Sequence, residues 1–184
     1  RMGTTDPAKT AVSFGQNLMW YSTPEYGMEF IERLGQTGLR VYPGSAHARE
    51  DLAAGAISAF IAGWEGAEME RFVSGVNVAW TYADIQPDYP NIFMAVSKNA
   101  PHPNAARLFT AWLFSEKGIE AYAKSQNYTT VIGAPDLRSG LPLLKETEWW
   151  EPYPVERGYV PDLKTWVAEY GPLSVKFSNA LQGR

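Results

Sequence analysis

The sequence predicts an α/β fold, in which a mixed β-sheet flanked by helices is followed by a helical C-terminal tail. Predicted strands alternate with predicted helices as far as residue 100, which is the order of a sheet with helices on both faces. Residues 57–62, Ile-Ser-Ala-Phe-Ile-Ala, are almost all apolar, as expected of a strand that helices cover on both sides. Beyond residue 100 the apolar spacing is that of helices alone.

Short apolar or alternating segments predict the strands. Four of them are residues 2–5, 39–42, 57–62 and 92–96, and a fifth, half-buried strand is indicated by the alternation of Val76, Val78, Trp80 and Tyr82. Asp6-Pro7 is expected to end the first strand and Gly63 the third, because these residues are typical of turns.

Two helices are predicted between the first strand and the second. One spans residues 8–21; the other begins at Thr23, a good N-cap, with Pro24 at its first position and Gly35 as its stop. Their apolar stripes are Ala11, Phe14 and Leu18 for the former, and Tyr26, Phe30, Ile31 and Leu34 for the latter.

Further helices are predicted from their caps and apolar faces. Ser45 caps one that ends near Gly55, and another runs over residues 64–72. Residues 101–104 open a helix with a predicted core face of Ala105, Leu108, Phe109, Trp112 and Leu113. Ser115 caps a helix over 116–124.

The C-terminal part changes character. Prolines, glycines and the pair Trp149-Trp150 indicate an ordered, irregular segment over 128–161. Two final helices are predicted. Their apolar residues are Leu163, Trp166, Val167 and Tyr170 in one, and Leu173, Phe177 and Leu181 in the other.

Composition narrows the class of protein. The chain has 184 residues, of which 45% are hydrophobic and 14% aromatic, so it is globular rather than disordered. The net charge of −4 comes from acidic and basic residues mixed along the chain, which argues against a nucleic-acid-binding face. Cysteine is absent, which excludes disulfides, thiolate catalysis and cysteine zinc sites. There is no run of 18 apolar residues.

The N-terminus has no signal peptide, and Arg1 precedes Met2. We therefore expect the chain to be cut or truncated at this end, so that the missing signal segment does not bear on its compartment.

Residues 98–109, Lys-Asn-Ala-Pro-His-Pro-Asn-Ala-Ala-Arg-Leu-Phe, are followed at 112–118 by Trp-Leu-Phe-Ser-Glu-Lys-Gly. This pattern resembles a signature of family 1 extracellular solute-binding proteins, the type II periplasmic binding proteins that include iron(III), thiamine and polyamine groups. Thr5-Asp6-Pro7 is similar to the family's strand leaving the hinge. Residues 51–55, Asp-Leu-Ala-Ala-Gly, resemble its "L-x-x-G-E-I" element, although Ala56 replaces the usual acidic residue. The resemblance covers roughly residues 1–130.

The resemblance implies half of a two-lobed protein that binds its ligand in the cleft between two α/β lobes. Residues 1–127 would be the second lobe, and 128–184 an irregular and helical tail that packs on the missing first lobe. The implied function is the periplasmic or extracellular substrate-binding component of an ABC importer, with or without a lipid anchor. Its implied partners are a small-molecule solute, the ABC permease in the membrane and the missing N-terminal lobe, and it would have no cofactor and no catalytic activity.

In α/β sheets, ligands bind beyond the carboxyl ends of strands, and helix N-termini hold anionic groups there. The resemblance places ligand contacts at three strand–helix junctions, 6–11, 44–46 and 63–65. The residues it implies are Lys9, Thr10, Ala11, Ser45, Trp64 and Glu65.

Each of these residues also has a structural interpretation. Ser45 would be only a helix cap, Thr10 an ordinary helix residue, Lys9 a solvated side chain, Trp64 a core residue and Glu65 a partner of its own helix dipole.

The chemistry of the ligand stays open. Iron-binding members carry a tyrosine pair where Glu65 and Gly66 stand, which disfavours direct ferric binding. Trp64 beside Glu65 suits an organic cation, whereas helix N-termini and Lys9 suit an anion or the acidic end of a zwitterion.

Three other functions compete with transport: an enzyme, a ligand-sensing domain and an interaction module. A metal-dependent or hydrolytic enzyme would have only His47 and His102 to use; His47 and Asp51, four apart, are more typical of a solvated helix face, and no catalytic motif is present. A ligand-sensing domain of a regulator or receptor would have the same fold. An interaction module would use the tail aromatics, Trp149, Trp150, Tyr153 and Tyr159, as an exposed patch.

Overall fold

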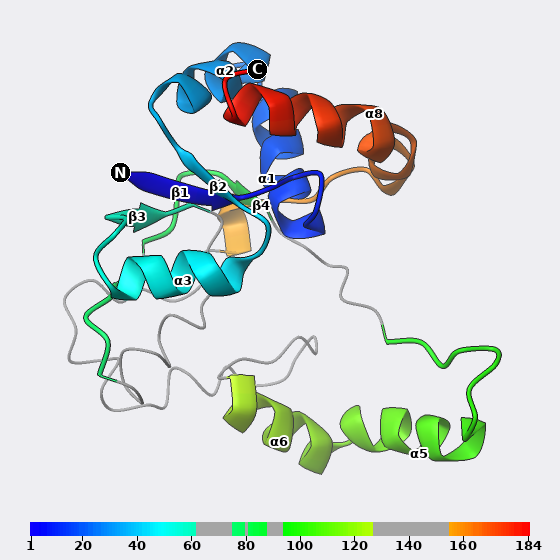
Figure 1. Cartoon of the computed structure of the whole chain (residues 1–184). Coiled ribbons are helices and arrows are strands. Elements are labelled where there is room, and N and C mark those ends of the chain that lie inside the picture. The colour runs from blue at the N-terminus through cyan, green and yellow to red at the C-terminus, as the bar shows by residue number, and fades with distance from the viewer. Residues whose placement is uncertain (62–74, 80, 88–93, 127–154) are drawn as a thin grey trace.

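The computed structural model describes residues 1–61, 75–79, 81–87, 94–126 and 155–184 (Figure 1). The described part is mixed α/β, so the predicted fold class is confirmed at this level. Its elements are β1 (Met2–Thr5), α1 (Ala11–Ser22), α2 (Gly27–Gln36), β2 (Arg40–Tyr42), α3 (Ser45–Ala53), β3 (Ala59–Phe60), β4 (Gln86–Pro87), α5 (Pro103–Leu113), α6 (Glu116–Gln126), a 3-10 turn (Val155–Arg157), β5 (Gly158–Tyr159) and α8 (Leu163–Leu181).

A three-stranded sheet in the order β2-β1-β3 is the centre of the fold, and within the described residues it is parallel and not mixed as predicted. Gly3 of β1 pairs with Arg40 of β2 on one side and with Phe60 of β3 on the other. Parallel neighbours need crossover connections, which are supplied by α1 with α2 and by α3. Strands β4 and β5 form a separate two-stranded parallel pair.

Helices cover both faces of the sheet, as the sequence predicts (Figure 1). Helices α1, α2 and α8 pack on one face around Phe14, Leu18, Ile31 and Phe177. Helix α3 covers the other face. The core there consists of Tyr42, Ala48 and Ile57, with Leu52 and Phe60 packed against them.

Position 3 of the central strand accommodates only glycine, because neighbouring side chains occupy the space that a larger side chain would fill. A β-carbon on Gly3 would lie 2.8 Å from Cδ1 of Ile57 and 2.8 Å from Cε2 of Tyr42. The absence of a side chain on Gly3 therefore lets the Tyr42 ring and the Ile57 side chain pack against the central strand.

The connection between α1 and α2 differs from the prediction. Thr23 does not cap the second helix: it follows α1, where its hydroxyl donates to the carbonyl of Met19 at 2.8 Å. A turn then leads to Gly27, whose φ of 64° favours glycine, and α2 begins there. Gly35 is not the stop either, because α2 continues to Gln36 and Gly38 takes the left-handed conformation.

The C-terminus forms one helix, α8, where the sequence indicates two. Pro172 lies inside it but is exposed, so the apolar stripe on the opposite side continues past it from Trp166 to Leu181. Near the start of this stripe, Trp166 and Tyr170 make edge contacts with Phe14 at centroid distances of 5.1 and 4.7 Å. Helix α8 thus packs on α1 and α2; packing of the 128–184 tail on a first lobe stays a prediction.

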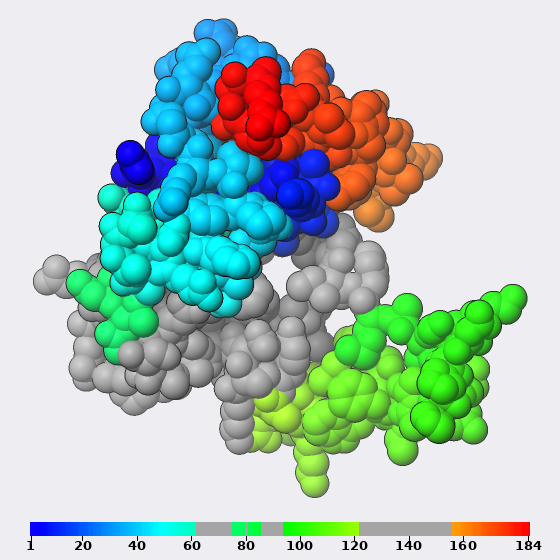
Figure 2. All heavy atoms as spheres, in the orientation of Figure 1, coloured from blue at the N-terminus to red at the C-terminus, as the bar shows by residue number. Residues whose placement is uncertain are grey.

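Helix α5 begins at Pro103, as predicted, but its expected core face is exposed. Leu108 is 72% exposed, Phe109 55% and Trp112 43%. Helix α5 packs against α6, and both lie apart from α1, α2, α3 and α8 (Figure 2). The prediction that these residues form a core is wrong within the described chain, because helical periodicity shows only that a face is apolar and not what covers it.

Several predicted strands are shorter or missing. Among residues 57–61, only Ala59 and Phe60 are in a strand, and Ala62 lies outside the described residues. The segment begins in a turn instead, because the amides of Ala56 and Ile57 both donate to the carbonyl of Asp51. Residues 75–79, 81–82 and 94–96 are described and are not strands, whereas Trp80 and residues 92–93 of the same predictions lie outside the described residues. The predicted helix at 64–72 lies outside the described residues.

Candidate functional site

The carboxyl ends of β1, β2 and β3 meet at one edge of the sheet, because the three strands are parallel. Thr5 leads into the turn before α1, and Tyr42 into Pro43 and Gly44 before α3. The structure therefore brings the predicted contacts at Lys9–Ala11 and at Ser45 to the same edge. The third predicted junction, with Trp64 and Glu65, lies outside the described residues.

The turn between β1 and α1 is held by its own hydrogen bonds. Asp6 is 7% exposed, its carbonyl accepts from the amides of Lys9 and Thr10, and its carboxylate accepts from the amide of Ala8 at 2.9 Å. The Thr10 hydroxyl donates toward the Asp6 carbonyl, lies 3.1 Å from Oγ1 of Thr5 and accepts from the amide of Ser13 at 3.4 Å. Thr10 is thus the N-cap of α1, which supports its structural interpretation.

Lys9 and Ala11 are both exposed at this turn. No ion pair joins Lys9 to another residue of the described chain. The ammonium group of Lys9 is therefore available to an anionic ligand, and Ala11, as the first residue of α1, contributes its backbone amide to the same edge.

The β2–α3 junction differs from the prediction in one respect. Ser45 is the first residue of α3, and Gly44 holds the N-cap position in an extended conformation. Gly44 has no side chain to cap the helix, and a β-carbon placed on it would meet nothing within 4 Å. Ser45 is half-buried. The N-terminus of α3 thus has no side-chain cap, and its first amides have no intrahelical acceptor, an arrangement that suits an acceptor from outside the chain.

One backbone hydrogen bond joins the two junctions. The amide of Asp6, just after β1, donates to the carbonyl of Tyr42, the last residue of β2, at 2.8 Å. The sequence placed Asp6 in a turn and Tyr42 at the end of a strand, but no pattern in it indicates that they meet.

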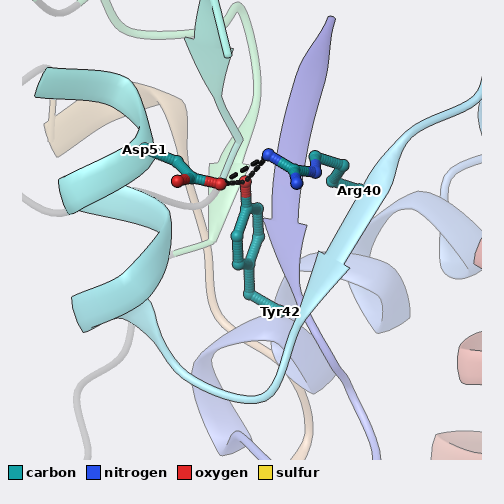
Figure 3. A network of polar contacts seen from close by, with 3 residues as sticks. All are labelled: Arg40, Tyr42 and Asp51. Atoms are coloured by element: carbon teal, nitrogen blue, oxygen red, sulfur yellow. Dashed lines mark hydrogen bonds and ion pairs between the residues drawn. The ribbon is translucent and has the colours of Figure 1, made fainter. Parts of the chain in front are cut away.

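Arg40, Tyr42 and Asp51 form a polar cluster beneath α3 (Figure 3). The Tyr42 hydroxyl donates to Oδ2 of Asp51 at 2.6 Å, and Nη1 of Arg40 lies 2.5 Å from the same oxygen. Burial and the hydrogen bond to Asp51 raise the pKa of Tyr42 above its usual value, although the Arg40 charge opposes this. The phenol therefore remains a donor at neutral pH.

The cluster also bears on the pair His47 and Asp51, which was considered as a weak metal site. The Asp51 carboxylate is used by Arg40 and Tyr42. His47 is exposed, and the described residues contain no group of three or more His, Cys, Asp or Glu side chains arranged for a metal ion.

A shallow groove of about 470 Å³ lies between α2 and the end of α8. Its lining includes Glu32, Gln36, Lys176 and Asn179, all of them exposed, and none of the junction residues. It is thus separate from the candidate site and has no buried polar group.

Comparison of the chain with protein-family models, with curated proteins and with solved structures finds no match. Within the described ranges, no helix is both long and apolar enough to cross a membrane.

Proposed function

We propose that this chain is the ligand-binding lobe of an extracytoplasmic substrate-binding component of an ABC importer. One observation carries the proposal: α1 and α3 follow neighbouring parallel strands, so their N-termini lie at one edge of the sheet. The resemblance of residues 98–118 to the solute-binding signature supports the same function. The proposed partners are a small solute, a membrane permease and a first lobe that closes the cleft.

The chemistry of the edge favours an anionic group on the solute. Each helix N-terminus attracts an anion by about 0.3–1 kcal/mol. The uncapped amides at the start of α3 and the exposed ammonium of Lys9 add donors. The Thr10 hydroxyl is already bonded within its turn, so it contributes less. Trp64 and Glu65 stay in the proposal as contacts for a cationic part of the solute.

The test is a ligand screen on this chain. Thermal shift and backbone-amide chemical shifts are recorded with amino acids, polyamines, thiamine, phosphonates, carboxylates and ferric chelates, because a ligand that binds the folded state raises the melting temperature. We expect one chemical class to shift the amides of Lys9–Ala11 and Ser45–Ala46. A binder that shifts only residues of α2 and α8 would contradict the proposal, and so would the absence of any binder.

Matched variants locate the contacts. Lys9→Ala and Ser45→Ala are each expected to weaken binding by about threefold to tenfold, the range for one charge or hydrogen bond. Lys176→Ala and Ser58→Ala are the controls. They remove an exposed lysine on α8 and an exposed serine before β3, and are expected to bind as the wild type does.

A further inference from the structure

Tyr42 contacts both junctions of the proposed site through different parts of the residue. Its carbonyl accepts the amide of Asp6, at the start of the turn into α1. Its side chain lies under α3, where the hydroxyl donates to Asp51. Two residues after Tyr42 comes Gly44, the N-cap of α3.

Asp51 has a matching double role on α3. Its carboxylate accepts from Tyr42 and pairs with Arg40, which attaches the helix to β2 (Figure 3). Its carbonyl accepts the amides of Ala56 and Ile57, which turns the chain toward β3. One residue thus fixes α3 relative to two strands of the sheet.

The cluster is partly shielded from water, which strengthens it. Tyr42 is 8% exposed, while the side chains of Asp51 and Arg40 are 33% and 46% exposed. The Arg40 guanidinium also lies 5.7 Å from the centroid of the Tyr42 ring. A tyrosine hydrogen bond to a charged carboxylate is stronger than one between neutral groups.

We infer that Tyr42 and Asp51 are positioning residues that hold the N-termini of α1 and α3 in register at the ligand-binding edge. The inference rests on the proposed function, because the two N-termini matter together only if one ligand contacts both. Tyr42 and Asp51 lie behind the edge, so they act through the backbone of the two junctions.

Amide hydrogen exchange tests the coupling without a ligand. Tyr42→Phe keeps the ring over Gly3 but removes the donor to Asp51. We expect exchange to become about tenfold faster at Asp6 and at 48–49, the first amides that donate within α3, since hydrogen bonds to charged groups contribute on this scale. Exchange at α8 amides is expected to change less.

Ile57→Val is the matched control, because it shortens a buried side chain in the same core without touching the polar cluster. At equal global stability, Ile57→Val should leave exchange at Asp6 and 48–49 as in the wild type. Unchanged exchange in Tyr42→Phe, or an equal change in both variants, would overturn the inference.

A binding measurement separates the inference from the proposed function. Sodium phosphate and sodium acetate are titrated while the amides of Ser45 and Ala46 are observed. If the wild type binds either anion, Tyr42→Phe and Asp51→Asn should bind about threefold to tenfold more weakly; equal affinity overturns the positioning role. If the wild type binds neither, anion capture at this edge fails, and the exchange comparison alone decides whether the junctions are coupled.

Discussion

Gly35 of α2 lies so close to the carbonyl oxygen of Ala180 in α8 that a β-carbon on Gly35 would overlap that oxygen. The two helices therefore pack backbone to backbone at this point. The contact closes the core that α1, α2 and α8 share, with Leu34 and Leu181 buried beside it. Closely packed helices of this kind need glycine at the crossing.

Gly35→Ala is expected to destabilise the protein by about 1–3 kcal/mol, the usual cost of forcing an extra carbon into a packed core. The midpoint of urea unfolding measures this. Gly171→Ala is the control, since a β-carbon at Gly171, also in a helix, would meet nothing within 4 Å. A Gly35→Ala protein as stable as the control would show that α2 and α8 do not pack as described.

Gly118→Ala is expected to separate α6 from α5. A β-carbon at Gly118 would overlap the carbonyl of Trp112 and would lie 2.6 Å from Cα of Leu113. Amide exchange across α6 should rise in this variant. Ser115→Ala is the comparison: it removes the hydroxyl that accepts from the Gly118 amide and should cost about 1 kcal/mol without a clash. Equal exchange in both variants would argue against steric exclusion at Gly118.

The raised pKa of Tyr42 predicts a loss of stability at alkaline pH. Burial and the Asp51 hydrogen bond favour the protonated phenol in the folded state. The contribution of the protonated Tyr42 phenol to the free energy of unfolding is therefore complete below the pKa of tyrosine in the unfolded chain. It is lost as pH rises through the pKa of Tyr42 in the folded state. The unfolding free energy should fall above about pH 10, and less steeply in Tyr42→Phe. Identical alkaline slopes would contradict this.

The lowered pKa of Asp162 predicts a loss of stability at acid pH. The backbone amide of Thr165, followed by its hydroxyl, donates to the carboxylate that caps α8, and these hydrogen bonds lower the pKa of Asp162. The contribution of the ionised Asp162 carboxylate to the free energy of unfolding is present above the pKa of aspartate in the unfolded chain. It disappears as pH falls through the pKa of Asp162 in the folded state. Carbon-13 titration should show a lowered pKa for Asp162, and Thr165→Val should raise it; an unshifted pKa would contradict the cap.

Trp64→Ala tests the contact predicted from sequence alone. If Trp64 stacks on a cationic part of the solute, its removal should cost about 0.5–2 kcal/mol of binding, or roughly twofold to thirtyfold in affinity. Calorimetry with the compound found in the screen measures this. Trp112→Ala, on the exposed face of α5, is the matched control. Unchanged affinity in Trp64→Ala would remove that residue from the site.

Local signals in the sequence predicted the elements that depend on neighbouring residues. Strand β1 is found at Met2–Thr5, as predicted, α3 ends just before Gly55 with its φ of 74°, and Ser115 accepts the Gly118 amide at the start of α6. A cap, a turn or a strand end is decided within a few residues, so its pattern can be recognised without the rest of the chain.

Other elements depart from what these local patterns predict. Thr23 and Pro24 have the pattern of a helix start, yet the Thr23 hydroxyl bonds back to Met19 and α2 begins at Gly27. Pro172 has the pattern of a helix break, yet the stripe that packs on α1 continues past it. At Pro172, tertiary packing outweighed the local preference of proline against helix interiors, which is about 3 kcal/mol.

The sequence by itself determined the α/β class and the strand–helix junctions at 6–11 and 44–46, because these follow from periodicity and capping, whereas Lys9–Ala11 and Ser45 were chosen as ligand contacts through the family resemblance. Only the tertiary structure decided that β1 and β2 are parallel neighbours, so that the two junctions share one edge. It also decided that Tyr42 joins Asp6 to Asp51, since residues 36 and 9 positions away from it meet only when the sheet forms and α3 folds over it.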